Sequence, residues 1–243
     1  MGPVTDLIDT TEMYLRTILE LEEEGITPLR ARIVERLDHS GPTVSQTVAR
    51  MERDGLLHVR DNRHLVLTDS GRAQAVGVMR KHRLAERLLS DVIGLDWAYI
   101  HEEACRREHV MSEQVERRLL ELLDHPVDSP YGNPIPGLEA LGQVSTQAGT
   151  DSGERLSIAL DQPGSYRVLR LTEAVQTDPE LLRDLAAAGV IPGAVIDARS
   201  ADGYVAVRAS EGSAAPLGPE GGDAIGLELS AETADHIRVT PIH

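Results

Sequence analysis

The sequence predicts a mainly helical N-terminal part that contains a winged helix-turn-helix, followed by a small β-barrel at the C-terminal end. Apolar residues recur at helical spacing from residue 5 to about residue 124. Two short apolar segments at 56–67 interrupt this pattern, as a hairpin would. Beyond residue 150 the helical pattern gives way to short alternating segments, which are typical of strands. A length of 243 residues is enough for one to two domains with proper cores.

The first predicted helices and the hairpin form the winged helix-turn-helix. Thr27 and Pro28 are expected to cap and open the second helix, and Pro42 opens the third. Gly55 ends that helix, and the hairpin follows it directly. The predicted elements are helices at 5–24, 29–37 and 42–55, and strands at 56–59 and 64–67.

Three more helices and a linker are predicted before the barrel. Thr68 caps a helix running to about residue 92, Asp96 caps one running to about 110, and Ser112 caps one running to about 124. Residues 125–150 are rich in proline and glycine and are expected to form a flexible linker. The barrel is expected from segments 156–160, 166–171, 195–198 and 204–207, with one helix at 179–188.

The net charge of −16 is unevenly distributed along the chain. Residues 126–243 carry 7 Arg against 17 Asp and Glu, or −10, whereas residues 28–72 carry 8 Arg against 6 acids, or +2. That local balance permits binding to double-stranded DNA. Six aromatic residues without any Phe argue against a single-stranded nucleic-acid partner. No long apolar run or signal peptide is visible, so Cys105 is interpreted as a reduced thiol in a cytoplasmic protein without a membrane partner.

The third predicted helix presents a polar face that can read DNA. Gln can pair with adenine in the major groove, and Ser and Thr can bond to bases or to phosphates. Winged helices also serve as protein-interaction modules, which is the alternative reading. The residues expected to point outward are Thr43, Ser45, Gln46, Thr47 and Arg50, and Arg30, Arg53 and Arg63 are placed to hold the phosphate backbone.

Four metal-ligand residues fall on one face of the predicted helix at 97–110. His101, Cys105, Glu108 and His109 are offset by 0, 4, 7 and 8 residues, which is an arc of roughly 100° on a helix. Imidazole, thiol and carboxylate donors suit a divalent transition ion and not calcium or magnesium. The alternative is a polar helix face whose His and Cys residues lie near a core.

Further ligand pairs and near-matches to catalytic motifs surround this cluster. His82 and Glu86 stand four residues apart on the preceding helix and could belong to a second site, or form an ordinary surface pair. Segments 101–105 and 105–109 each differ by one residue from zinc-peptidase motifs, because Cys105 replaces a histidine. A ligand-rich face tends to saturate the ion, so a metallohydrolase is the weaker alternative and an enzyme is not expected.

Several stretches of the chain carry a family resemblance. They are Thr10-Thr11-Glu12-Met13-Tyr14-Leu15, Ser40-Gly41-Pro42-Thr43-Val44-Ser45-Gln46, residues 79–87, Glu103-Ala104-Cys105, Glu108-His109-Val110-Met111 and Asn133-Pro134-Ile135-Pro136-Gly137. In these stretches the chain closely resembles the diphtheria toxin repressor and iron-dependent regulator family of metal-sensing repressors. The resemblance covers residues 6–141 and continues more weakly to the C-terminus.

The resemblance implies three domains and two metal sites. The domains would be a winged helix-turn-helix at 1–75, a helical dimerisation and metal-binding domain at 76–143, and an SH3-like domain with its linker at 144–243. The primary, activating site would comprise Met13, Cys105, Glu108 and His109. The ancillary site would comprise His82, Glu86, His101, Glu173 and Gln176, so the cluster on one helix face would serve two ions.

The resemblance also implies DNA contacts and an anion site. Bases would be read by Ser40, Pro42 and Gln46, and phosphates would be held by Thr10, Arg30, Thr43, Ser45, Arg50 and Arg53. An anion near the ancillary metal would be held by Arg83, Ser129 and Asn133.

We therefore interpret the chain as an Fe(II)-dependent repressor of iron-homeostasis genes that binds a palindromic operator as a homodimer. Met13 and Cys105 supply soft donors, which favour later ions over Mn(II). Co, Ni, Zn or Mn is expected to substitute in vitro, so the identity of the ion in the cell depends on availability. A manganese- or zinc-responsive repressor is the alternative from the same class.

Overall fold

The structure is a computed structural model that describes residues 9–143, 153–160, 163–210 and 226–242. The chain divides into two compact units, and neither unit is continuous in sequence. The first comprises Met1–Leu88, Glu103–Pro126 and Ile135–Val144, and the second comprises Leu89–Glu102, Val127–Pro134 and Ser145–His243.

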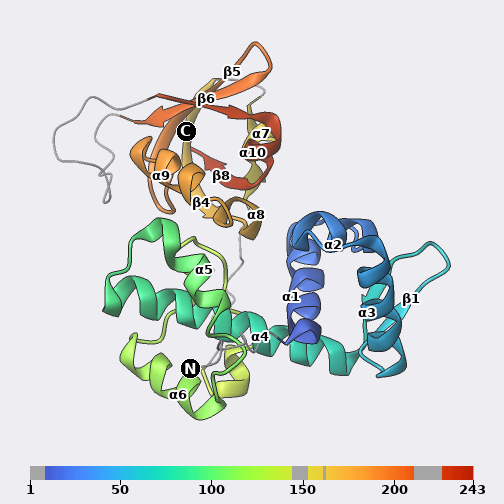
Figure 1. Cartoon of the computed structure of the whole chain (residues 1–243). Coiled ribbons are helices and arrows are strands. Elements are labelled where there is room, and N and C mark those ends of the chain that lie inside the picture. Colours follow the sequence, from blue (N-terminus) through green and yellow to red (C-terminus); the bar gives the residue numbers. More distant parts are fainter. Residues whose placement is uncertain (1–8, 144–152, 161–162, 211–225, 243) are drawn as a thin grey trace, which may run out of the picture. The chain divides into compact units, whose positions relative to one another are not determined.

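The N-terminal elements form the expected winged helix-turn-helix (Figure 1). Asp9 caps the first helix, and Ser40 caps the third by accepting a hydrogen bond from the backbone N–H of Thr43. The two strands pair antiparallel, with Leu57 opposite Leu67. Residues 5–8 of the expected first helix lie outside the described residues. The elements are α1 (Thr10–Glu23), α2 (Arg30–Leu37), α3 (Gly41–Arg53), β1 (Leu57–Val59) and β2 (Leu65–Leu67).

A single apolar cluster holds these elements together. Each element contributes residues from the face that its apolar spacing predicts, and the first part of the following helix closes the cluster. The cluster includes Tyr14, Leu15 and Ile18 from α1, Ile33 from α2, Val44, Val48 and Met51 from α3, Leu57 and Leu65 from the hairpin, and Ala75 and Met79.

Two local expectations in this region are wrong. Thr27 does not cap α2, because the helix begins at Arg30 after an extended Leu29, and the carbonyl of Pro28 accepts the backbone N–H of Leu65 instead. Thr47 does not point outward with the DNA-reading residues. It is 8% exposed and hydrogen-bonds to the hydroxyl of Tyr14 on α1.

The long helix α4 (Asp69–Arg87) begins where Thr68 accepts the backbone N–H of Gly71 at 3.0 Å, as the sequence predicts. It continues as a π-helical segment over Leu88–Ile93. Gly71 lies against the wing, since a Cβ at this position would stand 1.8 Å from the carbonyl oxygen of Leu56. α4 is therefore packed directly against the end of the helix-turn-helix.

Alanine substitutions at the two α4 glycines are expected to act in opposite directions. Gly71→Ala forces the Leu56 backbone away and lowers the free energy of unfolding by about 1–3 kcal/mol. Gly77→Ala meets nothing within 4 Å and raises that free energy by about 0.5–1 kcal/mol through helix propensity. Urea unfolding followed by circular dichroism measures both. Equal stability of the two variants would mean that α4 does not contact Leu56.

The expected single helix at 97–110 is shorter than predicted. A 3-10 turn at Trp97–Tyr99, capped by Asp96, leads into α5 (Ile100–Cys105), and turns follow from residue 106. The reason lies in Arg107, whose side chain donates to the carbonyl of Glu103 at 2.7 Å. That carbonyl would receive the backbone N–H of Arg107 in a continuing helix, and this N–H goes to Ala104 instead, at 2.9 Å. Glu108 and His109 therefore lie beyond the helix.

Helix α6 (Glu113–Leu122) begins after its predicted cap, Ser112, and the segment behind it is packed instead of flexible. Part of the expected linker forms a 3-10 helix, Leu138–Leu141. Ile135, Leu138 and Leu141 pack against leucines of α4 and α6. In the second unit, Tyr131 is fully buried and donates its hydroxyl to the carbonyl of Trp97 at 2.7 Å. Apolar residues among the prolines explain this packing, and residues 144–150 lie outside the described residues.

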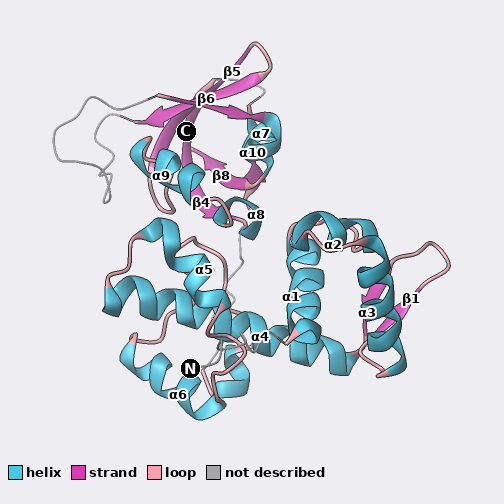
Figure 2. Ribbon diagram, in the orientation of Figure 1, coloured by secondary structure: helices cyan, strands magenta, loops and turns pink. Residues whose placement is uncertain are grey.

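The second unit is built on an antiparallel six-stranded sheet with the order β3-β8-β4-β5-β6-β7 (Figure 2). Segment 156–160, expected as a strand, forms a helix with Leu156 buried and Ile158 exposed. Predicted strands at 166–171, 195–198 and 204–207 and the helix at 179–188 are confirmed. The elements are β3 (Glu154–Arg155), α7 (Leu156–Ala159), β4 (Gly164–Leu171), α8 (Glu173–Gln176), α9 (Pro179–Ala187), β5 (Val195–Ala201), β6 (Tyr204–Ala209), β7 (Leu227–Ser230), α10 (Ala231–Asp235) and β8 (Ile237–Pro241). Among the described residues, the helices lack the length and apolarity needed to cross a membrane.

Candidate metal centre and DNA interface

Three segments of the first unit bring predicted metal ligands together. α4 contributes His82 and Glu86, α5 contributes Cys105, and the turn after α5 contributes Glu108. Ligand atoms of His82 and Cys105 lie within 4.8 Å of each other. The two ring nitrogens of His82 contact Glu108 Oε2 at 2.6 Å and Glu86 Oε1 at 2.9 Å. His82 therefore links residues that the family resemblance divides between two sites.

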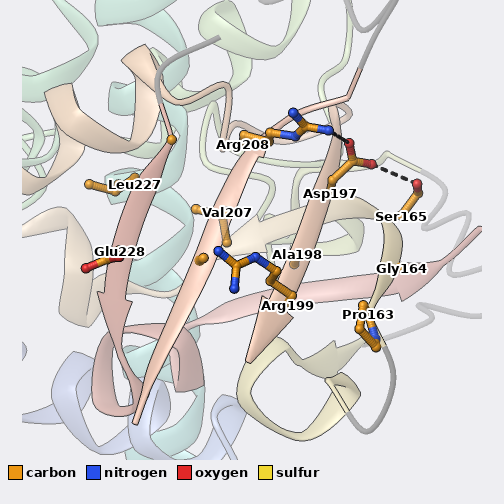
Figure 3. A pocket seen from close by; sticks show the side chains of 12 residues that line it. Pro163, Gly164, Ser165, Asp197, Ala198, Arg199, Val207, Arg208, Leu227 and Glu228 are labelled. Atoms are coloured by element: carbon orange, nitrogen blue, oxygen red, sulfur yellow. Dashed lines mark hydrogen bonds and ion pairs between the residues drawn. The ribbon is translucent and has the colours of Figure 1, made fainter. Parts of the chain in front are cut away.

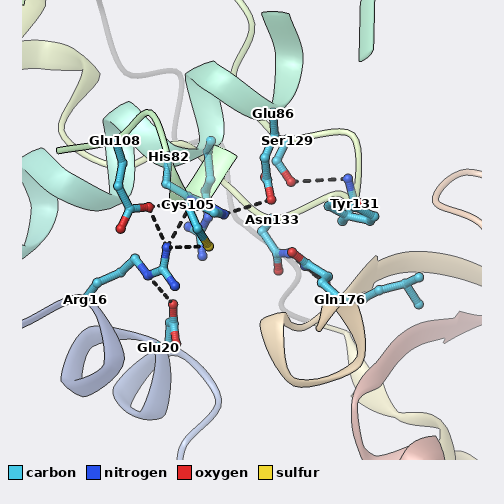
Figure 4. Close-up of polar contacts among 12 residues, drawn as sticks. Arg16, Glu20, His82, Glu86, Cys105, Glu108, Ser129, Tyr131, Asn133 and Gln176 are labelled. Atoms are coloured by element: carbon cyan, nitrogen blue, oxygen red, sulfur yellow. Dashed lines mark hydrogen bonds and ion pairs between the residues drawn. The ribbon is translucent and has the colours of Figure 1, made fainter. Parts of the chain in front are cut away.

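Helix α1 reaches this cluster through two side chains that sequence reasoning missed. Glu12 Oε2 lies 2.7 Å from His109 Nδ1. Arg16 Nη1 donates to Glu108 Oε2 at 2.5 Å and to Cys105 Sγ at 3.3 Å (Figure 4). The sequence could have indicated Arg16 through its position three residues after Met13, since residues three apart share a helix face. Met13 itself is half-buried and packs against the apolar cluster of the helix-turn-helix.

The electrostatics of the cluster keep Glu108 ionised. Burial raises the pKa of this carboxyl, but the Arg16 guanidinium and the hydrogen bond from His82 outweigh burial and lower its pKa to about 2. Burial also lowers the pKa of His82, and the charges of Glu86 and Cys105 reverse this, so its pKa stays well above the usual value. A buried carboxylate held ionised in this way is a ready cation ligand.

The donor set fits a divalent transition ion. A thiol, an ionised carboxylate and an imidazole converge in a mostly buried space, and a cationic guanidinium is already among them. His101 lies one turn before Cys105 on α5 and is 4% exposed. Glu12 faces one ring nitrogen of His109, which is how carboxylates orient metal-binding histidines.

The remaining predicted ligands and anion contacts have protein partners of their own. In the first unit, Arg83 is fully buried and pairs with Glu23 on α1 at 2.5 Å. In the second unit, Asn133 Nδ2 and Gln176 Nε2 both donate to the carbonyl of Leu171, at 2.7 and 2.8 Å. Ser129 Oγ accepts the backbone N–H of Tyr131 at 3.2 Å, and Glu173 is buried in α8. The ancillary and anion roles of these residues stay predictions.

The predicted DNA-contacting residues lie before and along the exposed face of α3, with others on α1, α2 and the wing. Pro42, Ser45 and Gln46 are exposed. Ser40 and Thr43 are also exposed, and their hydroxyls contact each other at 2.7 Å. The other members are Thr10 on α1, Arg30 on α2, Arg50 and Arg53 on α3, and Arg63, which has a φ of 66° in the wing turn.

A cavity of about 620 Å³ opens on the sheet of the second unit (Figure 3). Asp197 in its wall accepts hydrogen bonds from Ser165 at 2.9 Å and Ser210 at 2.5 Å and pairs with Arg208. These hydrogen bonds outweigh slight burial and lower the pKa of Asp197. The described residues that line the cavity include no His, Cys or Met, unlike the cluster in the first unit.

Comparison with known proteins identifies the family of this chain. Residues 6–65 match the family model "Iron dependent repressor, N-terminal DNA binding domain", and residues 68–137 match "Iron dependent repressor, metal binding and dimerisation domain". The chain belongs to the iron-dependent repressor family. It is thus a metal-dependent, DNA-binding transcriptional repressor that acts as a homodimer on double-stranded DNA, and it is not an enzyme.

Relatives of this repressor match over most of their length. It is 59% identical over 203 residues to the iron-dependent repressor IdeR of Mycobacterium tuberculosis, covering 82% of this chain and 88% of that protein. It is 54% identical over 200 residues to the diphtheria toxin repressor of Corynebacterium diphtheriae, covering 82% and 88%. The crystal structure of "T. acidophilum IdeR" is 29% identical with a TM-score of 0.72, covering 96% of this chain and 98% of that chain. A manganese-dependent transcriptional repressor solved with manganese is 27% identical with a TM-score of 0.76, covering 96% and 100%.

Proposed function

We propose that Fe(II) activates this repressor by binding to Met13, Cys105, Glu108 and His109. The observation that carries the proposal is that Cys105 and Glu108 converge on the buried guanidinium of Arg16, while His109 Nε2 lies 3.3 Å from Glu108 Oε1. Relatives at 54–61% identity are named iron-dependent repressors or diphtheria toxin repressors, which supports iron as the ion in the cell. Structural neighbours carry manganese and zinc, which supports substitution by other divalent ions in vitro.

The proposed site connects α1 to the segment that ends α5. Met13 lies between Glu12 and Arg16 on α1, and these two neighbours contact His109 and Glu108. When bound, the ion supplies a positive charge shared by donors from both segments. Because α1 packs directly on the helix-turn-helix core, tying it to α5 restricts the position of the DNA-reading helix. Metal then acts through its higher affinity for the conformation that binds DNA.

We further propose an ancillary site from His82, Glu86, His101, Glu173 and Gln176, and an anion site from Arg83, Ser129 and Asn133. The contact between His82 and Glu86, which are both buried on α4, supports the first. The proposed domains are 1–75, 76–143 and an SH3-like domain in 144–243, for which the six-stranded antiparallel sheet is the support. The proposed location is the cytoplasm, where a single Cys105 stays reduced.

An operator-binding titration with anaerobic Fe(II), Mn(II) and Zn(II) in parallel tests the proposal. Fluorescence anisotropy of a labelled palindromic operator reports affinity as each ion is added to the full chain. We expect Fe(II) to activate binding at a lower concentration than Mn(II), because Met13 and Cys105 supply soft donors. Activation by Mn(II) at the lower concentration would favour a manganese-responsive repressor, and binding without any metal would refute the proposal.

Gln46→Ala is expected to weaken operator binding far more than binding to random DNA. Gln46 is exposed near the start of α3, and one lost base contact costs about 1–3 kcal/mol at one position. Anisotropy titrations on both DNAs, with metal saturating, measure the two losses. Arg53→Ala is the control, because a lost phosphate contact weakens binding to both DNAs alike. Equal losses for Gln46→Ala would place Gln46 at the backbone.

A further inference from the structure

Arg16 is a buried cation at the centre of the proposed metal ligands. It is 7% exposed, and its Nη1 lies 3.3 Å from Cys105 Sγ, 2.5 Å from Glu108 Oε2 and 3.0 Å from His82 Nδ1 (Figure 4). Its Nε lies 2.9 Å from Glu20 Oε1, one turn further along α1. One guanidinium thus contacts donors from both proposed sites.

The guanidinium and a divalent ion need the same lone pairs. The Cys105 thiolate and the Glu108 carboxylate would hold a divalent ion through their lone pairs. Arg16 Nη1 engages both of these groups through hydrogen bonds. Two cations that share two ligand atoms also repel each other strongly in a buried space. Occupation by one therefore opposes occupation by the other.

Glu20 offers Arg16 a second position. Its carboxylate is 5% exposed, lies on the same helix and already pairs with Nε of Arg16. When Nη1 leaves Glu108, the guanidinium can keep a carboxylate partner without leaving the protein interior. A buried arginine that retains such a partner avoids most of the cost of an unpaired charge.

We propose that Arg16 is an internal competitor of the activating metal, and that it sets the metal concentration at which the repressor responds. This inference rests on the proposed function. Arg16 Nη1 donates hydrogen bonds to Glu108 and Cys105 until a divalent ion displaces it, and the guanidinium then keeps Glu20 as its carboxylate partner. Because Arg16 belongs to α1, its release also changes the contact between α1 and the turn after α5.

Cobalt titration of the full-length protein tests the competition directly. The absorption band from thiolate to Co(II) reports occupation of the Cys105 site independently of DNA binding. Arg16→Gln is expected to bind Co(II) at least 10-fold more tightly than the wild type. Arg16→Lys, which keeps the charge, is expected to stay within about 3-fold of the wild type. Equal or weaker binding by Arg16→Gln would mean that Arg16 orients the ligands, and would overturn the inference.

Two further variants serve as a control and as a second test of the competition. Arg80→Gln is the matched control, because Arg80 is a buried α4 arginine that pairs with Glu116 at 2.6 Å and contacts none of the proposed ligands in the described hydrogen bonds and ion pairs. Its Co(II) affinity is expected to be unchanged.

Glu20→Gln removes the carboxylate partner that Arg16 would keep after leaving Glu108, and is expected to weaken Co(II) binding at least 3-fold. If Arg16→Gln does not fold, Glu20→Gln provides the test in its place. Unchanged Co(II) binding by Glu20→Gln would overturn the inference.

The same titration separates this inference from the proposed function. The wild type must show the thiolate band, and Cys105→Ala must lose it. Absence of the band in the wild type contradicts the proposed metal site itself. Presence of the band with no gain in Arg16→Gln contradicts only the competition.

Discussion

Cys105→Ala is expected to abolish metal-activated operator binding while the fold stays intact. Cys105 supplies the single thiol of the chain to the proposed site, and it is half-buried at the end of α5. Loss of a residue that merely orients a ligand commonly costs about 10–100-fold in metal affinity, so loss of a ligand should cost ~100-fold or more. Anisotropy of a labelled operator at fixed Co(II) measures the effect.

Arg106→Ala is the control for Cys105→Ala. Arg106 is exposed, follows Cys105 directly and forms a surface ion pair with Glu103. Such pairs contribute little, about 0–1 kcal/mol, so operator binding should be close to that of the wild type. Thermal unfolding of both variants checks that the fold persists. Operator affinity of Cys105→Ala equal to that of the wild type would contradict the primary-site assignment.

Local signals were sufficient to predict much of the helical part. Thr68 and Ser112 cap their helices as predicted, because an N-cap depends on residues within one turn. The apolar periodicity of α1 and α3 identifies the buried faces for the same reason. The hairpin could be predicted from two short apolar segments with a polar turn between them.

The errors arise where tertiary or side-chain contacts override local pattern. The Arg107 side chain takes the carbonyl that would continue α5, which no periodicity reveals. Leu156–Ala159 forms a helix, since a short apolar run does not distinguish helix from strand. Thr47 turns inward because Tyr14, from another helix, provides a hydrogen-bond partner.

The candidate site likewise has some features that local sequence signals predict and others that depend on tertiary contacts. His82 with Glu86 could be found from spacing, because these two residues share one helix face. The contact of His82 with Glu108 needs the packing of α4 against the turn after α5. Glu12 and Arg16 are polar residues of α1, and their partners His109 and Glu108 lie more than 90 residues away in sequence. Only the three-dimensional structure relates them to the predicted ligands.

Met13→Ala and Glu108→Ala are expected to nearly eliminate activation, whereas His82→Ala should reduce it only in part. Glu108 contacts Arg16, His82 and His109, so its removal takes away the ionised carboxylate on which the proposed primary site depends. Met13 lies on α1, the helix that this site connects to α5. His82 is assigned to the ancillary site, and it reaches Glu108 only through its Nδ1 atom.

The hierarchy is measured by calorimetry of Co(II) binding on each variant, paired with operator binding at saturating Co(II). Met111→Ala is the control for Met13→Ala, because both side chains are half-buried against apolar clusters and Met111 is not a proposed ligand. A loss shared by the two methionine variants would reflect packing, whereas a loss specific to Met13→Ala reflects a thioether ligand. His82 contacts Glu86 of the proposed ancillary site and Glu108 of the proposed primary site. Comparing His82→Ala with Glu108→Ala therefore distinguishes which of the two sites holds the activating ion. If His82→Ala is more damaging than Glu108→Ala, the activating ion is held chiefly by α4, and the roles of the two sites are reversed.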